Sequence, residues 1–279
     1  MFKFFKYILT LFIIVFIIDR AFVGILDFII DRSDIRFTNL KNEDADYYVF
    51  GNSRGVHSFN EFEFEKSYNL KTLNVSYNSL SPKEIKFLIS KVDSTKKIII
   101  EVSSFLESLD CKTDNNEKVT VFNSFKHLRN NNLFSDIFKS TYYNNELTFR
   151  ALYHFFRTDK TWVNYRILNN DKLNFLLLSE SNFYYDLKNY DELRKYLDQN
   201  NYDYIMYFAP IHFKLKKKIL NWDKINSSLH SDLGEKYLDL SDLIFDDSGF
   251  ADLVHTNHNS SLKINEEIYQ FVKLNYLEN

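Results

Sequence analysis

A serine in the first quarter of the chain and a histidine–aspartate pair near its end are the residues that could do chemistry together. Ser53 stands in Gly51-Asn52-Ser53-Arg54, directly after the apolar run Tyr47–Phe50, and Asp252 precedes His255 by three residues. A serine hydroxyl becomes a nucleophile when an imidazole takes its proton, and the imidazole needs a carboxylate to fix its tautomer. Ser53, His255 and Asp252 therefore favour an acyl-transfer triad. Taken alone, Ser53 fits a capping residue in a strand-to-helix turn better than a nucleophile, and its pairing with Asp252 and His255 favours the nucleophile.

These two blocks, Gly51-Asn52-Ser53-Arg54 and Asp252-Leu253-Val254-His255, resemble the SGNH/GDSL hydrolase-like superfamily over roughly residues 45–279. The likeness is to membrane-anchored, extracytoplasmic members associated with bacterial surface polysaccharides. The resemblance implies that Ser53 is the nucleophile, His255 the general base and Asp252 the residue that orients it. The aspartate that usually precedes the serine is Asn52 here, a change that leaves the nucleophile in place.

An acyl-transfer site also needs hydrogen-bond donors for the oxyanion, and the chain departs from the family pattern here. The N–H of Ser53 is one expected donor. The family usually offers a glycine after the second strand, where this chain has Ser76, whose N–H can still donate, and Asn78 nearby. The asparagine expected after the third strand is missing from Glu101-Val102-Ser103-Ser104. Because one lost donor typically costs ~10²–10³ in rate, either another group compensates or the protein is slow or inactive.

Three further residues lie near the predicted site. Arg54 could clamp a substrate carboxylate or phosphate, although pairing with a buried acid beneath the site is the preferred interpretation. His212 follows the fourth predicted strand and either contacts substrate or has no role. His258, with Asp252 and His255, has the spacing of metal ligands, but no second cluster completes a coordination sphere. We therefore expect His258 to be a surface or capping residue, and we expect no metal and no cofactor.

Composition excludes some classes of function. The chain has 279 residues, 45% of them hydrophobic and 26% charged, which suits one substantial globular domain plus an appendage. A formal net charge of −3 without a basic stripe argues against a nucleic-acid partner. The single cysteine, Cys111, rules out an intramolecular disulfide framework.

The N-terminus predicts a membrane anchor. Lys3 and Lys6 precede an uncharged run over residues 7–18, and a second, mostly apolar run covers 21–30. Twelve residues fall short of the ~20 that a span needs, but Phe4 and Phe5 extend the run if Lys6 snorkels. The N-terminal positive charges favour a cytoplasmic N-terminus and export of the remainder. The alternatives are a cleaved signal peptide, for which no small-x-small site follows Ile18, and an amphipathic or core helix.

Between these ends the pattern predicts an α/β fold, a three-layer parallel-sheet SGNH-like domain. Expected strands cover 47–50, 72–75, 97–102, 204–208 and 236–240. Expected helices cover 60–68, 82–92, 185–199, 211–220, with a lysine-rich solvated face, and 260–274. A helical insertion at about 103–183 is predicted to cover the strand ends. Residues 1–30 form the anchor and juxtamembrane segment, and 31–279 form the SGNH hydrolase-like domain.

The resulting hypothesis is a membrane-anchored serine esterase or O-acyltransferase with an extracytoplasmic catalytic domain. The resemblance implies ester groups, with O-acetyl as the expected case, on a cell-surface polysaccharide, and membrane proteins of polysaccharide biosynthesis as partners. The alternative is a non-catalytic SGNH-like assembly factor for exopolysaccharide or capsule, which the missing asparagine favours and the complete triad opposes.

Overall fold

A computed structural model describes residues 2–32, 40, 44–78, 80–106, 152, 155–156, 163, 165–169, 182–244 and 246–277. The chain divides into two compact units. One consists of residues 1–39 and 116–160, and the other of residues 40–115 and 161–279. The sequence-based division into an anchor segment over residues 1–30 and a domain over 31–279 stays a prediction.

The first unit contains the long N-terminal helix α1 (Phe2–Arg32). Its stretch Lys3–Ile29 is long and apolar enough to cross a membrane. With ~1.5 Å of rise per residue, the helix is longer than the ~30 Å hydrocarbon core of a bilayer. Most of its apolar side chains are exposed, and the ring of Phe28 lies 6.2 Å from that of Phe155 in the same unit. The expected N-terminal helix is thus present, and it continues two residues beyond the predicted boundary at residue 30.

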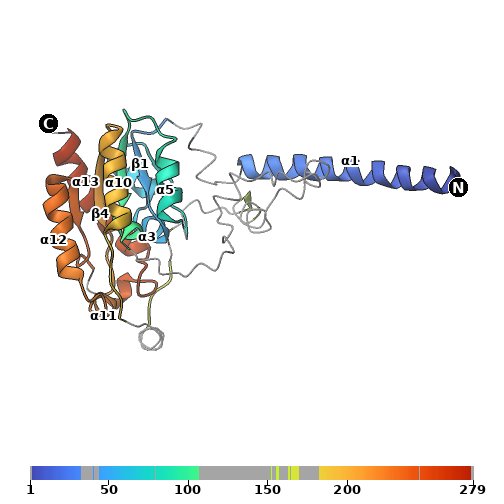
Figure 1. Cartoon of the computed structure of the whole chain (residues 1–279). Coiled ribbons are helices and arrows are strands. Elements are labelled where there is room, and N and C mark those ends of the chain that lie inside the picture. The colour runs from blue at the N-terminus through green and yellow to red at the C-terminus, as the bar shows by residue number, and fades with distance from the viewer. Residues whose placement is uncertain are drawn as a thin grey trace. The chain divides into compact units, whose positions relative to one another are not determined.

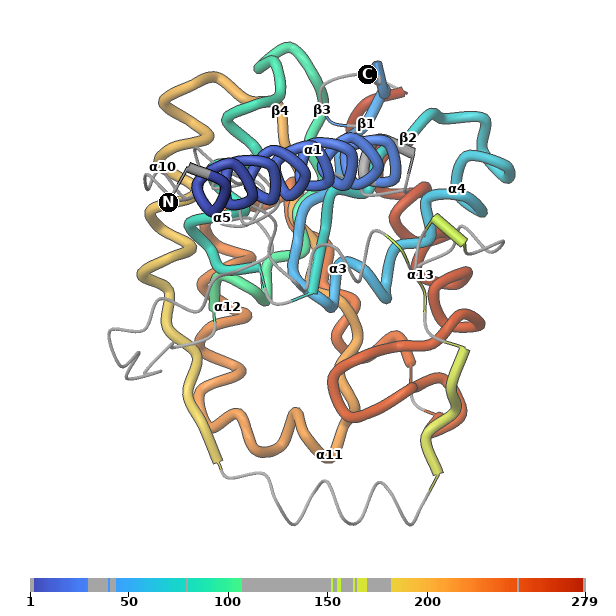
Figure 2. Tube along the Cα trace, turned by 90° about the vertical axis from the view of Figure 1, so that its right-hand side faces the viewer, coloured from blue at the N-terminus to red at the C-terminus, as the bar shows by residue number. Residues whose placement is uncertain are grey.

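A parallel sheet forms the centre of the second unit. Its strands are β1 (Tyr47–Phe50), β2 (Thr72–Asn74), β3 (Lys97–Glu101), β4 (Asp203–Phe208) and β5 (Tyr237–Asp239). The five strands lie in the order β2-β1-β3-β4-β5, and every neighbouring pair is parallel. Figure 2 shows β4, β3, β1 and β2 side by side in this order. The chain passes from β1 to β2 on one side and then crosses to β3 on the other side of β1. The carboxyl end of β1 is therefore a topological switch point, where α/β proteins bind ligands.

Helices run alongside the strands (Figure 1). They are α3 (Ser53–Ser58), α4 (Glu61–Tyr68), α5 (Pro82–Ile89), α10 (Lys188–Gln199), α11 (Phe213–Lys216), α12 (Trp222–Leu233) and α13 (His258–Val272). Short turns of other helix types are η1 (Val102–Phe105), η3 (Gly234–Lys236), η4 (Asp247–Gly249) and η5 (Lys273–Leu277).

Alternate residues of the strands face different helices, which gives three layers. On one face, Val49 and Ile99 share a core cluster with Phe64 of α4 and Ile264 of α13. On the other face, the Phe208 ring lies 4.6 Å from that of Trp222 in α12, and the hydroxyl of Tyr204 donates to Asp198 of α10 over 2.8 Å. Since both faces are covered, β1 and the inner residues of β3 and β4 form continuous apolar runs. The predicted three-layer parallel α/β architecture is confirmed; its assignment to the SGNH superfamily stays a prediction.

Side-chain caps fix where the helices near the site begin. Asn52 caps α3, Asn60 caps α4 and Asn257 caps α13, each by accepting a backbone N–H of the first turn. Ser81 and Glu84 form a capping box at the start of α5, with proline in the first turn. These caps satisfy donors that a helix N-terminus leaves without intrahelical partners.

Two sequence predictions about helices were incomplete. The expected helix over 211–220 is only the four-residue α11, and the separate helix α12 was not predicted. Within the predicted insertion, η1 forms its first turn, and most of 103–183 lies outside the described residues.

Candidate active site

Ser53 is the first residue of α3, directly beyond the carboxyl end of β1. The side chain of Asn52 holds this turn by accepting the Arg54 N–H over 2.9 Å. Gly51 and Gly55 let the turn approach the neighbouring strands closely. A Cβ on Gly51 would lie 2.9 Å from the Cβ of Glu101, and one on Gly55 would lie 2.5 Å from the Oγ of Ser76. The absence of side chains at these glycines therefore lets α3 lie directly against the ends of β2 and β3.

His255 and Asp252 come from the loop that precedes α13. The carboxylate of Asp252 accepts the backbone N–H groups of Val254 and His255 over 3.0 and 2.9 Å. Its two oxygens also lie 2.9 and 2.8 Å from Nδ1 of His255. The loop closes on itself because the Ala251 N–H donates to the carbonyl of His255 over 2.8 Å. These backbone contacts therefore hold the carboxylate of Asp252 beside Nδ1 of His255.

The loop and α3 bring the three predicted triad residues together. Nε2 of His255 lies 2.7 Å from Oγ of Ser53, while Nδ1 faces Asp252. With the proton on Nδ1 donated to the carboxylate, Nε2 accepts the hydroxyl proton of Ser53, which is the arrangement that general-base activation requires. The side chains of His255 and Asp252 are 20% and 32% exposed, so the site is partly open to solvent.

The environment keeps Asp252 ionised. Burial acts to raise the pKa of this carboxyl group, because it disfavours the charged form. The hydrogen bond and charge of His255, together with the backbone N–H groups of Val254 and His255, outweigh burial and hold the pKa below its usual value. An ionised Asp252 can orient the imidazole and stabilise its protonated form.

The predicted oxyanion donors differ in whether their N–H groups already have an acceptor. The N–H of Ser53, at the first position of α3, has no intrahelical acceptor. The N–H of Ser76, in contrast, donates to Oδ1 of Asn74 over 3.0 Å, and Ser76 is fully buried. The expectation that Ser76 offers its N–H to substrate is therefore wrong for this conformation, because a side chain two residues earlier has taken that donor. Asn78 lies exposed in the turn beyond, and its role stays a prediction.

The stretch after β3 turns its hydroxyls inward. Ser103 donates to Oε2 of Glu101 over 2.7 Å, and Ser104 donates to the carbonyl of Glu101 over 3.2 Å. Both serines are buried, with their side-chain hydroxyls bonded to Glu101. The missing asparagine is thus not replaced by the hydroxyl of either serine.

Arg54 does not reach toward a substrate. Its side chain is 4% exposed, and its guanidinium donates to the carbonyls of Ala209 and, over 3.4 Å, Pro210. Nε lies 4.0 Å from Oε1 of the fully buried Glu101, and the guanidinium carbon lies 4.4 Å from the centre of the Phe208 ring. Substrate binding by Arg54 is therefore a corrected expectation. The preferred structural interpretation, an arginine beside a buried acid beneath the site, matches the geometry.

His212 is also placed away from substrate. It is fully buried; its Nε2 lies 2.8 Å from Oδ1 of Asp247, and its Nδ1 accepts the Lys214 N–H at the start of α11 over 3.3 Å. Both ring nitrogens are engaged, which does not favour substrate contact, one of the two alternatives that the sequence left open for His212. His258 begins α13, stacks on Tyr165 with ring centres 4.7 Å apart, and lies 3.4 Å from the Asn60 amide.

A second imidazole beside the triad was missed. His57 lies four residues after Ser53, on the same side of α3, and its ring centre is 5.0 Å from that of His255 in an edge-on arrangement. Its carbonyl accepts the Thr256 hydroxyl over 3.2 Å, which ties α3 to the triad loop. The four-residue spacing from Ser53 was the signal in the sequence that could have pointed to it.

Comparison with other proteins adds no assignment. The chain matches no family model, and no curated protein sequence is significantly similar to it. Among the residues that the structure describes, no group of three or more His, Cys, Asp or Glu side chains could hold a metal ion. The function must therefore be argued from the geometry of Ser53, His255 and Asp252.

Proposed function

We propose that the protein is a serine esterase or O-acyltransferase that acts through Ser53, His255 and Asp252. The observation that carries the proposal is the continuous hydrogen-bonded chain from Oγ of Ser53 through the ring of His255 to the carboxylate of Asp252. Acceptance of both backbone N–H groups by that carboxylate holds the base in place before substrate arrives.

In the first step, Oγ of Ser53 attacks the carbonyl carbon of an ester while Nε2 of His255 takes the hydroxyl proton. Negative charge develops on the carbonyl oxygen, and the N–H of Ser53 donates to it. Asp252 stabilises the imidazolium that forms. The imidazolium then gives its proton to the departing alkoxide as the carbon–oxygen bond breaks, which leaves an acyl group on Ser53.

In the second step, His255 takes a proton from an acceptor hydroxyl, which attacks the acyl carbonyl. The imidazolium then returns a proton to Oγ of Ser53 as the bond between Oγ and the acyl carbon breaks. Water as the acceptor gives an esterase, and a sugar hydroxyl gives an acyltransferase. The triad serves both reactions. The substrate suggested by the family resemblance is an O-acyl group, such as O-acetyl, on a cell-surface polysaccharide.

A membrane-anchored location accompanies this function. Helix α1 is long and apolar enough to span a bilayer, and Lys3 and Lys6 precede its apolar stretch. These charges favour a cytoplasmic N-terminus, with the α/β unit outside the cytoplasmic membrane near polysaccharide-biosynthesis proteins. A periplasm-active reporter fused after Asn279 should be active, and a cytoplasm-active reporter at the same place should be silent. The reverse pattern would contradict this orientation.

A non-catalytic assembly factor is the second candidate, and the donor geometry favours it. Ser76 has given its N–H to Asn74, and Ser103 and Ser104 turn their hydroxyls to Glu101, so the oxyanion has few preformed donors. A protein that binds an acylated glycan without turning it over would tolerate this loss.

Ester hydrolysis distinguishes the two candidates. The full chain in detergent should hydrolyse p-nitrophenyl acetate, and Ser53→Ala should reduce the rate by ~10³-fold or more. Ser58→Ala is a matched control, because Ser58 also lies on α3 but contacts Tyr207 rather than the triad. Equal rates for the wild type and Ser53→Ala would remove the enzyme and leave the assembly factor.

A further inference from the structure

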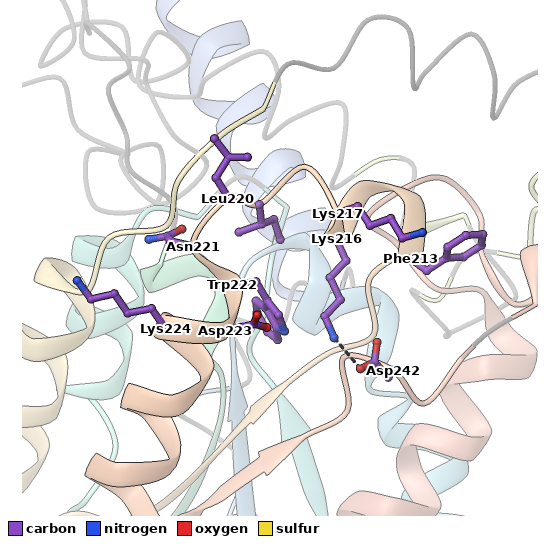
Figure 3. A pocket seen from close by; sticks show the side chains of 10 residues that line it. Phe213, Lys216, Lys217, Leu220, Asn221, Trp222, Asp223, Lys224 and Asp242 are labelled. Atoms are coloured by element: carbon purple, nitrogen blue, oxygen red, sulfur yellow. Dashed lines mark hydrogen bonds and ion pairs between the residues drawn. The ribbon is translucent and has the colours of Figure 1, made fainter.

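A cavity of about 710 Å³ lies beyond the carboxyl ends of β4 and β5, apart from the triad. Side chains from α11, the turn after it, the first turn of α12 and the loop after β5 line it (Figure 3). We call it the lysine pocket, after its lining residues Lys216, Lys217 and Lys224. Its size is in the range of sites for small ligands.

The charges of the pocket are unevenly paired. Lys216 is held at the floor, where its ammonium bonds to Asp242 over 2.6 Å and to Ser241 over 3.0 Å, and lies 4.8 Å from the centre of the Trp222 ring. Lys217 and Lys224 are exposed, and within the described part of the chain no carboxylate forms an ion pair with either. Two ammonium groups are thus available to an anionic ligand.

Figure 3 shows how these groups are arranged. Lys217 and Lys224 lie on opposite sides of Lys216 and Trp222, with their ammonium groups turned outward. Leu220 is 51% exposed, which adds an apolar wall, and the exposed Asp223 adds a hydrogen-bond acceptor. Ammonium groups suit carboxylates, the apolar wall suits the C–H faces of a sugar ring, and a carboxylate suits hydroxyls.

The position of the pocket relates it to the triad. All strands are parallel, so the end of β5 and the end of β1 share one edge of the sheet. Strands β3 and β4 separate them, so the two ends lie about three strand spacings, or ~14 Å, apart. A polymer lying along this edge could occupy both places at once.

We propose that the lysine pocket binds acidic sugar residues of a glycan whose ester group reaches Ser53. The inference rests on the proposed function for its link to catalysis and names the substrate class, a glycan bearing carboxylates. A membrane surface is the weaker fit, because Lys216 bonds to Asp242 inside the pocket and is not presented to a flat layer of headgroups.

The test measures binding of a galacturonic acid decamer to the full chain in detergent. The methyl-esterified decamer has the same sugars without charge and should bind at least about tenfold more weakly. Lys217→Glu with Lys224→Glu should lower the affinity for the acidic decamer by about tenfold or more. Lys83→Glu with Lys195→Glu makes the same change in charge on exposed sites of α5 and α10 and should leave binding unchanged. Trp222 fluorescence, in a Trp162→Phe background that removes the other tryptophan, should report the binding.

Several results would overturn the inference. These are equal affinity for the esterified decamer, equal loss in the control pair, and lysine-dependent capture by phosphatidylglycerol vesicles without binding of the decamer. Failure of the proposed enzyme is distinguishable: Ser53→Ala should still bind the decamer, and the Lys217→Glu/Lys224→Glu protein should still hydrolyse p-nitrophenyl acetate. Ser53→Ala should lose hydrolysis because its nucleophile is gone, whereas loss of hydrolysis in the Lys217→Glu/Lys224→Glu protein would indicate misfolding. Circular dichroism spectra matching the wild type are therefore required of each variant.

Discussion

Oγ of Ser53 lies 2.7 Å from Nε2 of His255, although the two residues are 202 positions apart in the sequence. The contact depends on two local structural features. Gly51 and Gly55 let α3 settle against β2 and β3, and the Asp252 carboxylate shapes the loop that carries the imidazole. Each feature can be altered on its own.

Replacing the carboxylate of Asp252 by an amide should show its effect on the imidazole of His255 without disturbing the fold. Asp252→Asn keeps an oxygen that can accept the backbone N–H groups of Val254 and His255, but it removes the charge that stabilises an imidazolium. We expect kcat for p-nitrophenyl acetate to fall by ~10⁴-fold, while the circular dichroism spectrum stays that of the wild type. A rate within a few-fold of the wild type would exclude Asp252 from the mechanism.

The same residue should make stability depend on pH in acid. The pKa of Asp252 is lowered in the folded chain, whereas an unfolded aspartate titrates at about 3.9. Its contribution is therefore complete above the unfolded pKa and is lost as the pH falls through the folded pKa. The difference in urea midpoint between the wild type and Asp252→Asn should be largest near neutral pH and shrink below about pH 4. An unchanged difference across this window would contradict the assignment.

His57 should position His255 by packing. His57→Phe keeps a ring beside the imidazole, and we expect kcat within a few-fold of the wild type. His57→Ala leaves the edge of His255 unsupported and should lower kcat about tenfold, because small displacements of a base are costly. Equal loss in both variants would instead indicate that the imidazole of His57 takes part in the chemistry.

The buried pair of Arg54 and Glu101 should contribute to the stability of the fold rather than to catalysis. Arg54→Met leaves the carboxylate of Glu101 buried without its cation, and we expect the free energy of unfolding to fall by about 3–5 kcal/mol. Glu101→Gln added to Arg54→Met removes the uncompensated charge and should recover part of the loss, measured by urea unfolding of the full chain in detergent. Strict additivity of the two single changes would show that the groups do not interact.

Close packing of α3 gives a test of the fold beneath the triad. Gly55→Ala places a methyl group 2.5 Å from Oγ of Ser76 and should cost about 1–3 kcal/mol of unfolding free energy. Ser76→Gly in the same chain removes the obstructing side chain and should restore much of that loss. Gly24→Ala, where nothing lies within 4 Å of the added Cβ, is the matched control and should have little effect. No destabilisation by Gly55→Ala would mean that α3 is not held this closely.

The sequence predicted β1 and β4 well because each is a short, largely apolar run that is buried along almost its whole length. β1 matches the expected bounds, and β4 differs by one residue. Helix α12 was missed because Asn226, Ser227 and Ser228 are weak helix formers. Its apolar residues Trp222, Ile225, Leu229 and Leu233 nevertheless recur at helical spacing and are buried. The burial of these apolar residues therefore stabilises α12, although its local sequence has a low helix propensity.

The site was predictable where local chemistry determines it. Asp252 and His255 are three residues apart, and their contacts follow from that spacing. The positions of the Arg54 and His212 side chains depend on partners far along the chain, such as Ala209 for Arg54. No local sequence pattern reveals that these side chains are buried. The capture of the Ser76 N–H could have been foreseen, because an asparagine two residues earlier commonly accepts such a donor.

Covalent labelling of Ser53 tests the central claim most directly. A fluorophosphonate reacts with a serine whose hydroxyl is activated by a neighbouring base. Mass spectrometry of the full chain should find the phosphonyl group on Ser53, and His255→Ala should abolish it while the protein remains folded. An unlabelled Ser53 in the folded wild type, or equal labelling in His255→Ala, would contradict activation of Ser53 by His255.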